Sequence, residues 1–473
     1  MAKQSQVSPG LLLTVLCVAS FMAGLDLFIV NVAFTDIGRE FAGTSMADLS
    51  WVLNAYAIVF AALLVPLGRL ADRYGRKAGF LLGLAVFTAA SLACAAAPSL
   101  GWLIGSRVAQ AAGAAALIPT SLGLLLAAYP PRRRAGAVRI WSAAAAVAAA
   151  AGPAAGGVLV ELSWRWVFAV NVPIGILVLA CALRYVPDSR EGRSSRVPDL
   201  AGAAILTAAI ALLALGIVEA GDWTGRQTAV VVGTSLLILL WFWLRSQRHP
   251  SPVLEPALLG VRTFGWSNAA ILLFTVAFAA NLLVGILWMQ QIWQYSAIRT
   301  GLCVAPGPLM VPLFALVAGR MVARGVPVGL VTALGCSLCA AGVVLMGSSI
   351  GQTPAYATEM LPGWLIGGTG VGLALPTILS AAAADLPDHR FATGSAVVNM
   401  SRQIGGVLGV SVAVAVLGTP QGYADAHRAF VQAWLVVAVL LVVAALAALG
   451  MTPRRPRPVP SVREKETEVV AGT

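Results

Sequence analysis

Charged side chains are scarce in this sequence of 473 residues, because Asp, Glu, Lys and Arg together make up only 11% of it. Soluble globular proteins carry about a quarter of their residues as charged ones. Hydrophobic residues reach 59% and the mean hydropathy is +0.87. Apolar runs of roughly 20 residues recur along the chain, each long enough for a membrane-spanning helix, and alternating segments typical of membrane strands are lacking. The composition therefore predicts an all-α integral membrane protein.

Lysine, histidine and cysteine are also few, which excludes several kinds of site. The only lysines are Lys3, Lys77 and Lys465, and no G-x-x-x-x-G-K-[ST] loop for ATP is present. Cys336 and Cys339 have a metal-like spacing, but they lie in an apolar run with no histidine near them in the sequence. Short loops and the lack of H-E-x-x-H or G-x-S-x-G motifs argue against an enzyme. We therefore expect no metal, no organic cofactor and no catalytic domain.

Apolar windows between charged or Pro/Gly-rich breaks predict fourteen transmembrane helices. They lie near residues 11–34, 49–67, 79–97, 101–128, 139–160, 166–184, 201–218, 228–244, 265–290, 301–319, 328–347, 356–380, 391–417 and 429–450. Of the 31 lysines and arginines, five then lie outside, two lie within spans, and the remaining 24 lie on the cytoplasmic side with both termini. The positive-inside rule supports this orientation, so the net charge of +12 reflects topology rather than nucleic-acid binding.

A short internal repeat suggests that the chain was duplicated. The segment LGRLADRYG at 67–75 resembles AGRMVARG at 318–325, and each follows the second span of a possible six-helix half. A chance match of so few residues is the alternative. The repeat predicts an N-terminal six-helix bundle (1–184), a linker with an inserted two-helix hairpin (185–262), a C-terminal six-helix bundle (263–452) and a disordered cytoplasmic tail (453–473).

Several motifs together resemble one family over nearly the whole chain. GLDLFIVNVAFTDI, GRLADRYGRK, LIGSRVAQAAGAA and AGPAAGG are similar to signature motifs of the major facilitator superfamily. SWRWVFAVNVPIG and FATGSAVVNMSRQIGGVLGVSV resemble segments of its fourteen-helix drug:H+ antiporter branch. The resemblance implies a multi-pass protein of a bacterial cell membrane that exports small toxic compounds against protons, by alternating access and as a monomer. A proton-coupled importer of a nutrient stays open as the alternative.

Asp26 and Arg107 are ionisable residues at membrane depth, where such groups usually face the bundle interior or a water-filled cavity. Each lies about six or seven residues, roughly 10 Å, from the outer end of its span. They are therefore expected to pair directly or through water. Burial favours the neutral form of a carboxyl group and a guanidinium favours the carboxylate, so Asp26 is our candidate for proton coupling. A purely structural ion pair is the alternative.

Two further motifs are candidates for conformational roles. The loop after the second span contains the proposed gating residues Gly68, Arg69, Asp72, Arg73, Gly75 and Arg76. The fifth span contains a candidate hinge of Gly152, Pro153, Gly156 and Gly157, in which proline removes a backbone donor and glycines permit close helix packing. Orientation of the chain and simple packing, respectively, are the alternatives.

Polar and aromatic residues inside or at the ends of spans are candidates for the substrate cavity. They are Asn31, Gln110, Asn171, Gln291, Trp293, Glu359, Asn399 and Arg402. An aromatic belt at the membrane surface is the other interpretation of Trp293 and its neighbours, and an interfacial position is the other interpretation of Glu359. Arg402 is equally compatible with packing and with substrate contact.

Overall fold

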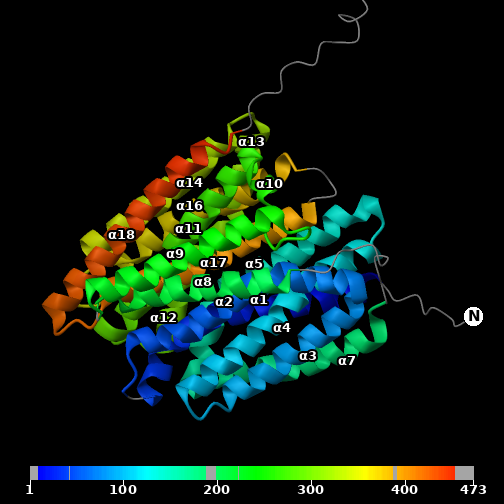
Figure 1. Cartoon of the computed structure of the whole chain (residues 1–473). Helices are drawn as coiled ribbons and strands as arrows, with labels where there is room; N and C mark the ends of the chain where they lie inside the picture. Colours follow the sequence, from blue (N-terminus) through cyan, green and yellow to red (C-terminus); the bar gives the residue numbers. More distant parts are fainter. Residues whose placement is uncertain (1–8, 42, 188–198, 222, 387–390, 453–473) are drawn as a thin grey trace, which may run out of the picture.

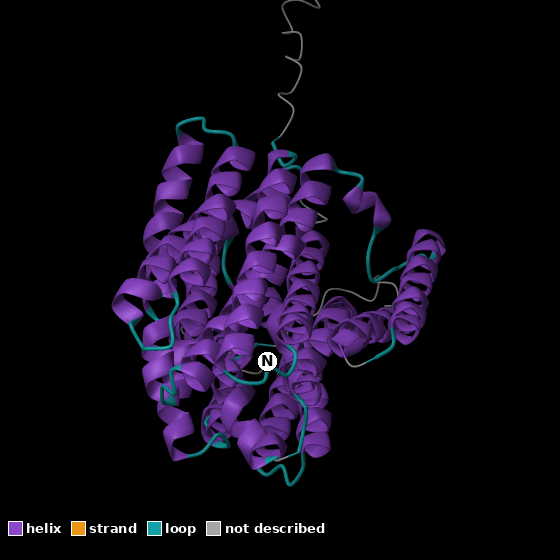
Figure 2. Ribbon diagram, turned by 90° about the vertical axis from the view of Figure 1, so that its left-hand side faces the viewer, coloured by secondary structure: helices purple, strands orange, loops and turns teal. Residues whose placement is uncertain are grey.

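The computed structural model describes residues 9–41, 43–187, 199–221, 223–386 and 391–452, and in these ranges it contains helices and no strand (Figures 1 and 2). The helices of the first part are α1 (Pro9–Glu40), α2 (Met46–Tyr74), α3 (Arg76–Ala95), α4 (Leu100–Ala128), α5 (Pro131–Leu162), α6 (Trp166–Ala169) and α7 (Asn171–Tyr185). Next come α8 (Leu200–Val218), a 3-10 turn (Glu219–Gly221), α9 (Gly225–Arg248) and α10 (Pro256–Leu259). The last part holds α11 (Arg262–Leu287), a π-helix (Trp288–Ile292), α12 (Ala297–Val304), α13 (Pro306–Ala323), α14 (Val328–Ser349), α15 (Tyr356–Glu359), α16 (Leu361–Ala384), α17 (Phe391–Leu417) and α18 (Tyr423–Leu449).

Thirteen helical segments of the described residues are long and apolar enough to cross a membrane. Each agrees with one of the predicted spans. The predicted span at 139–160 falls in α5, whose described apolar part, Ala151–Leu162, is shorter. The count of fourteen and the cytoplasmic side of both termini therefore stay predictions, and the tail 453–473 lies outside the described residues.

Two predicted spans bend at a proline. The segment 297–323 is divided into α12 and α13, and Pro306 is the first residue of α13. The segment 356–384 is divided into α15 and α16, with Pro362 in the first turn of α16. Proline lacks a backbone N–H and is tolerated where a helix starts, so each bend falls where the hydrogen-bond ladder is interrupted anyway.

The helices form two groups with a hairpin between them (Figure 1). In the first group, α1 packs on α5, and α4 packs on α2 and α3. In the second group, α11 packs on α17 and α18, and α14 packs on α16 and α18. The hairpin of α8 and α9 contacts both groups, because α8 lies against α2 and against α17. The groups also meet where α2 crosses α17 and where α5 crosses α12.

Glycines bring helix backbones together at matching places of the two groups. A Cβ atom at Gly113 of α4 would lie 2.5 Å from the Phe87 backbone nitrogen of α3. A Cβ atom at Gly370 of α16 would lie 2.4 Å from the Gly335 carbonyl oxygen of α14. Both pairs of helices therefore touch backbone to backbone, as small residues allow inside a membrane.

Candidate functional site: a buried ion pair and the helix that touches it

Asp26 lies on α1 in the interior of the first helix group and is 0% exposed. It forms an ion pair with Nη1 of Arg107, on α4, whose side chain is 1% exposed. The second carboxylate oxygen accepts hydrogen bonds from Gln110 Nε2 at 2.8 Å and from Asn171 Nδ2 at 3.1 Å. Both oxygens of Asp26 are therefore occupied by donors.

The guanidinium of Arg107 is enclosed in a similar way. Its Nε donates to the Val52 carbonyl oxygen at 3.0 Å, and its Nη1 also donates to Gln110 Oε1 at 2.7 Å. The ring of Tyr56, on α2, lies 4.1 Å from the guanidinium carbon, in the geometry of a cation–π contact. Helices α1, α2, α4 and α7 thus all contribute to one sealed polar cluster.

Gln110 and Asn171 were predicted as residues of a substrate cavity, and the structure places both in this cluster. Gln110 is 0% exposed and also donates to Ser91 Oγ at 2.9 Å, and Asn171 is 1% exposed. Val52 and Tyr56 were not among the predicted residues. Nothing in the sequence distinguishes their contribution, because one acts through its backbone and the other through an apolar ring face.

The candidate hinge on α5 lies between this cluster and the second helix group. A Cβ atom at Gly152 would lie 2.7 Å from Phe28 Cβ, and one at Gly156 would lie 2.9 Å from the Ile29 carbonyl oxygen, close to Asp26 on α1. On its other side, α5 touches α12, where a Cβ atom at Gly157 would lie 2.6 Å from the Ala297 carbonyl oxygen. A Cβ atom at Gly301 would lie only 2.2 Å from the Pro153 carbonyl oxygen. The helix α5 is therefore in direct backbone contact with both the Asp26 helix and the opposite group.

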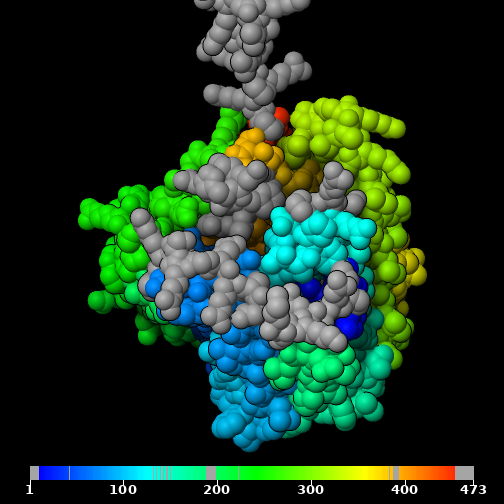
Figure 3. Space-filling view, turned by 90° about the vertical axis from the view of Figure 1, so that its right-hand side faces the viewer, coloured from blue at the N-terminus to red at the C-terminus, as the bar shows by residue number. Residues whose placement is uncertain are grey.

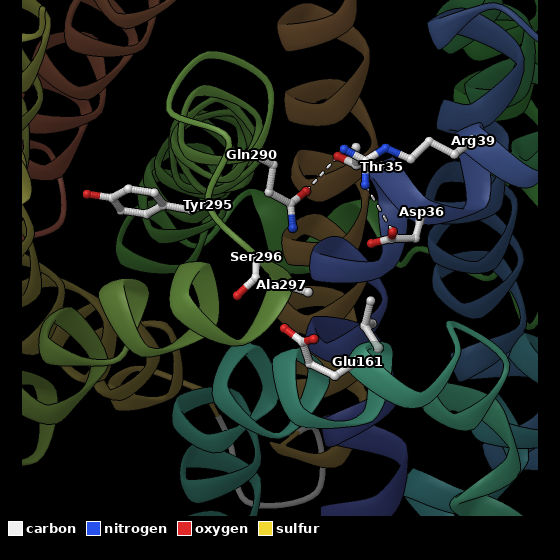
Figure 4. Close-up of a pocket in the computed structure, with 9 residues that line it drawn as sticks. Thr35, Asp36, Arg39, Glu161, Gln290, Tyr295, Ser296 and Ala297 are labelled. Atoms are coloured by element: carbon white, nitrogen blue, oxygen red, sulfur yellow. Dashed lines mark hydrogen bonds and ion pairs between the residues drawn. The ribbon is translucent and has the colours of Figure 1, made fainter. Parts of the chain in front are cut away.

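The two groups are also joined by hydrogen bonds at the end of the bundle predicted to face outward. Gln290, in the π-helix, accepts from Thr35 Oγ1 at 2.5 Å (Figure 4). It also donates to the Val32 carbonyl oxygen at 3.0 Å. Beside this contact is a cavity of about 250 Å³, whose lining includes Asp36 and Glu161. By contrast, α5 makes few contacts with α13, the segment that continues α12 toward the other side. In addition to the contact of α2 with α17, the groups are thus held together at the ends predicted to face outward.

Replacing Gln290 by alanine is expected to loosen this outer contact. The change removes two hydrogen bonds, each worth about 0.5 to 1.5 kcal/mol, so we expect the outer end to open more often, by about tenfold. The measurement is the labelling rate of a cysteine placed at Glu161 by a thiol reagent that does not cross membranes. Gln432→Ala, at an exposed glutamine on α18, serves as the control, and equal labelling in both variants would show that Gln290 does not hold the outer end closed.

The predicted gating loop lies at the opposite end of α2. Gly75 has a φ of 130°, a conformation that favours glycine, and it ends α2 just before α3 begins. Arg76 Nε pairs with Asp72 Oδ1 at 2.6 Å and packs against Gly123 of α4. Gly68 is in close contact with Pro119 of α4. These contacts bind the loop to its own helix group.

Arg69 instead contacts the segment that follows the inserted hairpin. Its guanidinium pairs with Glu255 at 2.9 Å and donates to Ser251 Oγ and to the Pro252 carbonyl oxygen. At the start of the hairpin, Asp199 caps α8 and pairs with Arg245 of α9. Although burial alone raises the pKa of the Asp199 carboxyl group, hydrogen bonds from Arg245 and from the Gly202 N–H hold that pKa below its ordinary value. Arg73 places its guanidinium 5.6 Å from the ring of Tyr74.

The remaining predicted residues of a substrate cavity do not form one cluster. Asn31 donates to the Leu27 and Phe28 carbonyl oxygens of its own helix, and Gln291 is exposed. Trp293 is buried and donates to the Gly351 carbonyl oxygen at 2.9 Å. Glu359 accepts from the Gly351 N–H at 2.8 Å, which fixes the turn between α14 and α15. Asn399 and Arg402 share one face of α17. In the described part of the chain, no three His, Cys, Asp or Glu side chains group as metal ligands.

The sequence of this chain matches a protein-family model and several known proteins. The family model described as Major Facilitator Superfamily matches residues 16–410. The chain is 34% identical to "Multidrug resistance protein Stp" of Mycobacterium tuberculosis, over 84% of this chain and 74% of that protein. It is 35% identical to "Cephamycin export protein CmcT" of Amycolatopsis lactamdurans, over 96% of this chain and 94% of that protein.

A solved structure of a peptide transporter of the POT family, in complex with sulfate, has a similar fold. The TM-score is 0.68 and the alignment covers 93% of this chain and 94% of that one, at 15% sequence identity. At this identity the likeness establishes the arrangement of the helices only.

Proposed function

The chain belongs to the major facilitator superfamily, and we propose that it is a secondary transporter that exports small amphipathic toxic compounds, such as antibiotics, dyes, antiseptics or a natural product, in exchange for protons. The observation that carries the proposal is the Asp26–Arg107 pair, sealed inside a membrane-spanning bundle whose relatives are named for drug resistance and export. An ionisable pair at this depth is costly to a membrane protein unless it has a function.

Protonation of Asp26 is the proposed coupling step. A neutral carboxyl group no longer compensates the guanidinium of Arg107, so the hydrogen bonds from Gln110 and Asn171 rearrange and α1 shifts relative to α4. Because Gly152 and Gly156 are in contact with α1 two to three residues from Asp26, this shift is passed to α5. Through Gly157, α5 passes it to α12, and the outer contact between the two helix groups opens. Protons are thus the coupling ion, and no other cofactor takes part.

The protein is further proposed to act as a monomeric transport unit in the bacterial cell membrane, with no catalytic activity and no nucleic-acid partner. The thirteen apolar helices and the bacterial relatives support a multi-pass membrane protein.

Expression of the full chain in an efflux-deficient bacterial host tests this function. We expect the host to tolerate higher concentrations of at least one antibiotic, dye or antiseptic and to accumulate less of it, and we expect a protonophore to abolish both effects. Intracellular concentration is measured directly, with the empty vector as control. Greater accumulation in the expressing cells would instead identify a proton-coupled importer, and an effect that survives the protonophore would contradict proton coupling.

A further inference from the structure

Arg402 is a guanidinium in the middle of the membrane with no partner in the described part of the chain. It lies eleven residues after the start of α17 and fifteen before its end, which is about 16 Å and 22 Å along the helix axis. No hydrogen bond and no ion pair joins its side chain to any described residue. No aromatic ring of the described residues makes a cation–π contact with it either. It lies deep in the protein and still keeps part of its surface exposed.

The carboxylates of the protein are not available to Arg402. Asp26, the acidic side chain at comparable depth, is occupied by Arg107. The described acids of the second helix group lie at helix ends and have their own partners: Glu359 binds the Gly351 N–H, Asp385 accepts from Thr263, and Asp425 pairs with Arg428. An uncompensated cation at membrane depth is costly, so its retention indicates an anion that comes from outside the chain.

Arg402 lies at the edge of the face of α17 that packs on α11. Gly405 and Gly409 touch the backbone of α11, and Ser411 accepts a hydrogen bond from Asn54 of α2. Gly406, one turn after Arg402, lies on the side of α17 turned away from α11, and a Cβ atom there would meet no atom within 4 Å. Figure 3 shows cyan α5 next to the yellow-green residues of α13 and α14 on this face of the molecule.

We propose that Arg402 binds the carboxylate, or an equivalent anionic oxygen group, of the exported compound, so that acids and zwitterions are the preferred substrates. The inference rests on the proposed export function and specifies its substrate class. A guanidinium presents a planar fork of N–H donors that matches a carboxylate, and in a cavity with little water such a charged hydrogen bond is stronger than on a surface. Asn399, one turn before Arg402 and partly exposed, adds an amide to the same face.

The test compares acids with their neutral esters. Everted membrane vesicles that contain the full chain are given benzylpenicillin, cefoxitin or nalidixic acid, or the methyl ester of each, and protonophore-sensitive uptake is measured by mass spectrometry. We expect the wild type to prefer at least one acid over its ester. Arg402→Gln is expected to lower uptake of that acid by about tenfold or more and to leave ester uptake within about twofold, because a hydrogen bond to a charged group is worth about 1.5 to 3 kcal/mol. Arg402→Lys is expected to retain part of the preference, since it keeps the charge without the fork.

Arg428→Gln serves as the matched control, because Arg428 is 72% exposed at the outer end of α18 and pairs with Asp425. An acid-to-ester ratio that is the same in wild type and Arg402→Gln overturns the inference. If the wild type transports none of the six compounds, the proposed export of these compounds is wrong. The inference about Arg402 is then tested by a binding measurement on the purified protein. In that case an acid that raises the melting temperature of the purified wild type, but not of Arg402→Gln, supports the site, and no such shift with any acid overturns it.

Discussion

Export by the Asp26→Asn variant is expected to fall to the level of the empty vector, and the little transport that remains is expected to be insensitive to a protonophore. Asparagine keeps the shape of the side chain and can still accept from Gln110 or Asn171, but it cannot take up or release a proton. The measurement is protonophore-sensitive efflux of a transported compound, at matched amounts of folded protein in the membrane. Asp425→Asn is the control, because that carboxylate lies in an exposed ion pair at the outer end of α18.

The same variant leaves Arg107 buried without its counter-charge, which costs about 3 to 5 kcal/mol and could prevent folding. The double variant Asp26→Asn/Arg107→Gln removes both charges and keeps a hydrogen-bonding pair. We expect it to restore the amount of folded protein and not to restore coupled export. If the double variant instead transports like the wild type, the pair serves to hold α1 and α4 together, and proton coupling must be located elsewhere.

Gly301→Leu is the second change for which we expect a large effect. The first carbon of the new side chain would lie 2.2 Å from the Pro153 carbonyl oxygen and 3.1 Å from the Ala154 Cα atom. Both are backbone atoms of α5, so the clash cannot be relieved by rotating a side chain. The helices α5 and α12 must separate, and the outer end of the transporter cannot close. Export should therefore be lost although Asp26 and Arg107 are unchanged.

Labelling from outside distinguishes this trapped state from simple unfolding. A cysteine at Glu161, next to the outer cavity, should react at least tenfold faster in Gly301→Leu than in the wild-type background, since overpacking of a close contact costs about 1 to 3 kcal/mol. Gly101→Leu is the control, because a Cβ atom at Gly101 meets nothing within 4 Å. Normal export by Gly301→Leu would show that the contact between α5 and α12 is not needed for transport.

The membrane spans and the Asp26–Arg107 pair could be predicted because a charge in an apolar run is visible in the sequence. Each residue's depth follows from the helical rise, and equal depth restricts its partners to a few candidates. The structure joins the two directly. The roles given to them stay predictions, as do those of the gating loop and the hinge.

Uncharged polar residues were harder to place. Gln110 and Asn171 can hydrogen-bond inside a helix group or line a cavity, and the amino-acid sequence does not distinguish these two situations. Gln290 was not predicted at all, because its contact with Thr35, 255 residues away in the chain, depends on a π-helix and on the relative position of the two helix groups. Glycine motifs predicted close packing on α5, but not that its two sides touch α1 and α12. Only tertiary structure assigns such partners.

Among the described residues, two guanidiniums and one carboxylate lie at mid-membrane, and we expect this imbalance of charge to make the transporter sensitive to voltage. Each elementary charge that moves through a potential of 100 mV gains or loses about 2.3 kcal/mol. In a cell that is negative inside, the empty transporter is therefore drawn toward the state in which Arg402 is accessible from the cytoplasm. An anion bound at Arg402 cancels that charge and removes the preference. With the site proposed above, membrane voltage returns the empty protein to the side where cargo is loaded and does not hold back the loaded protein.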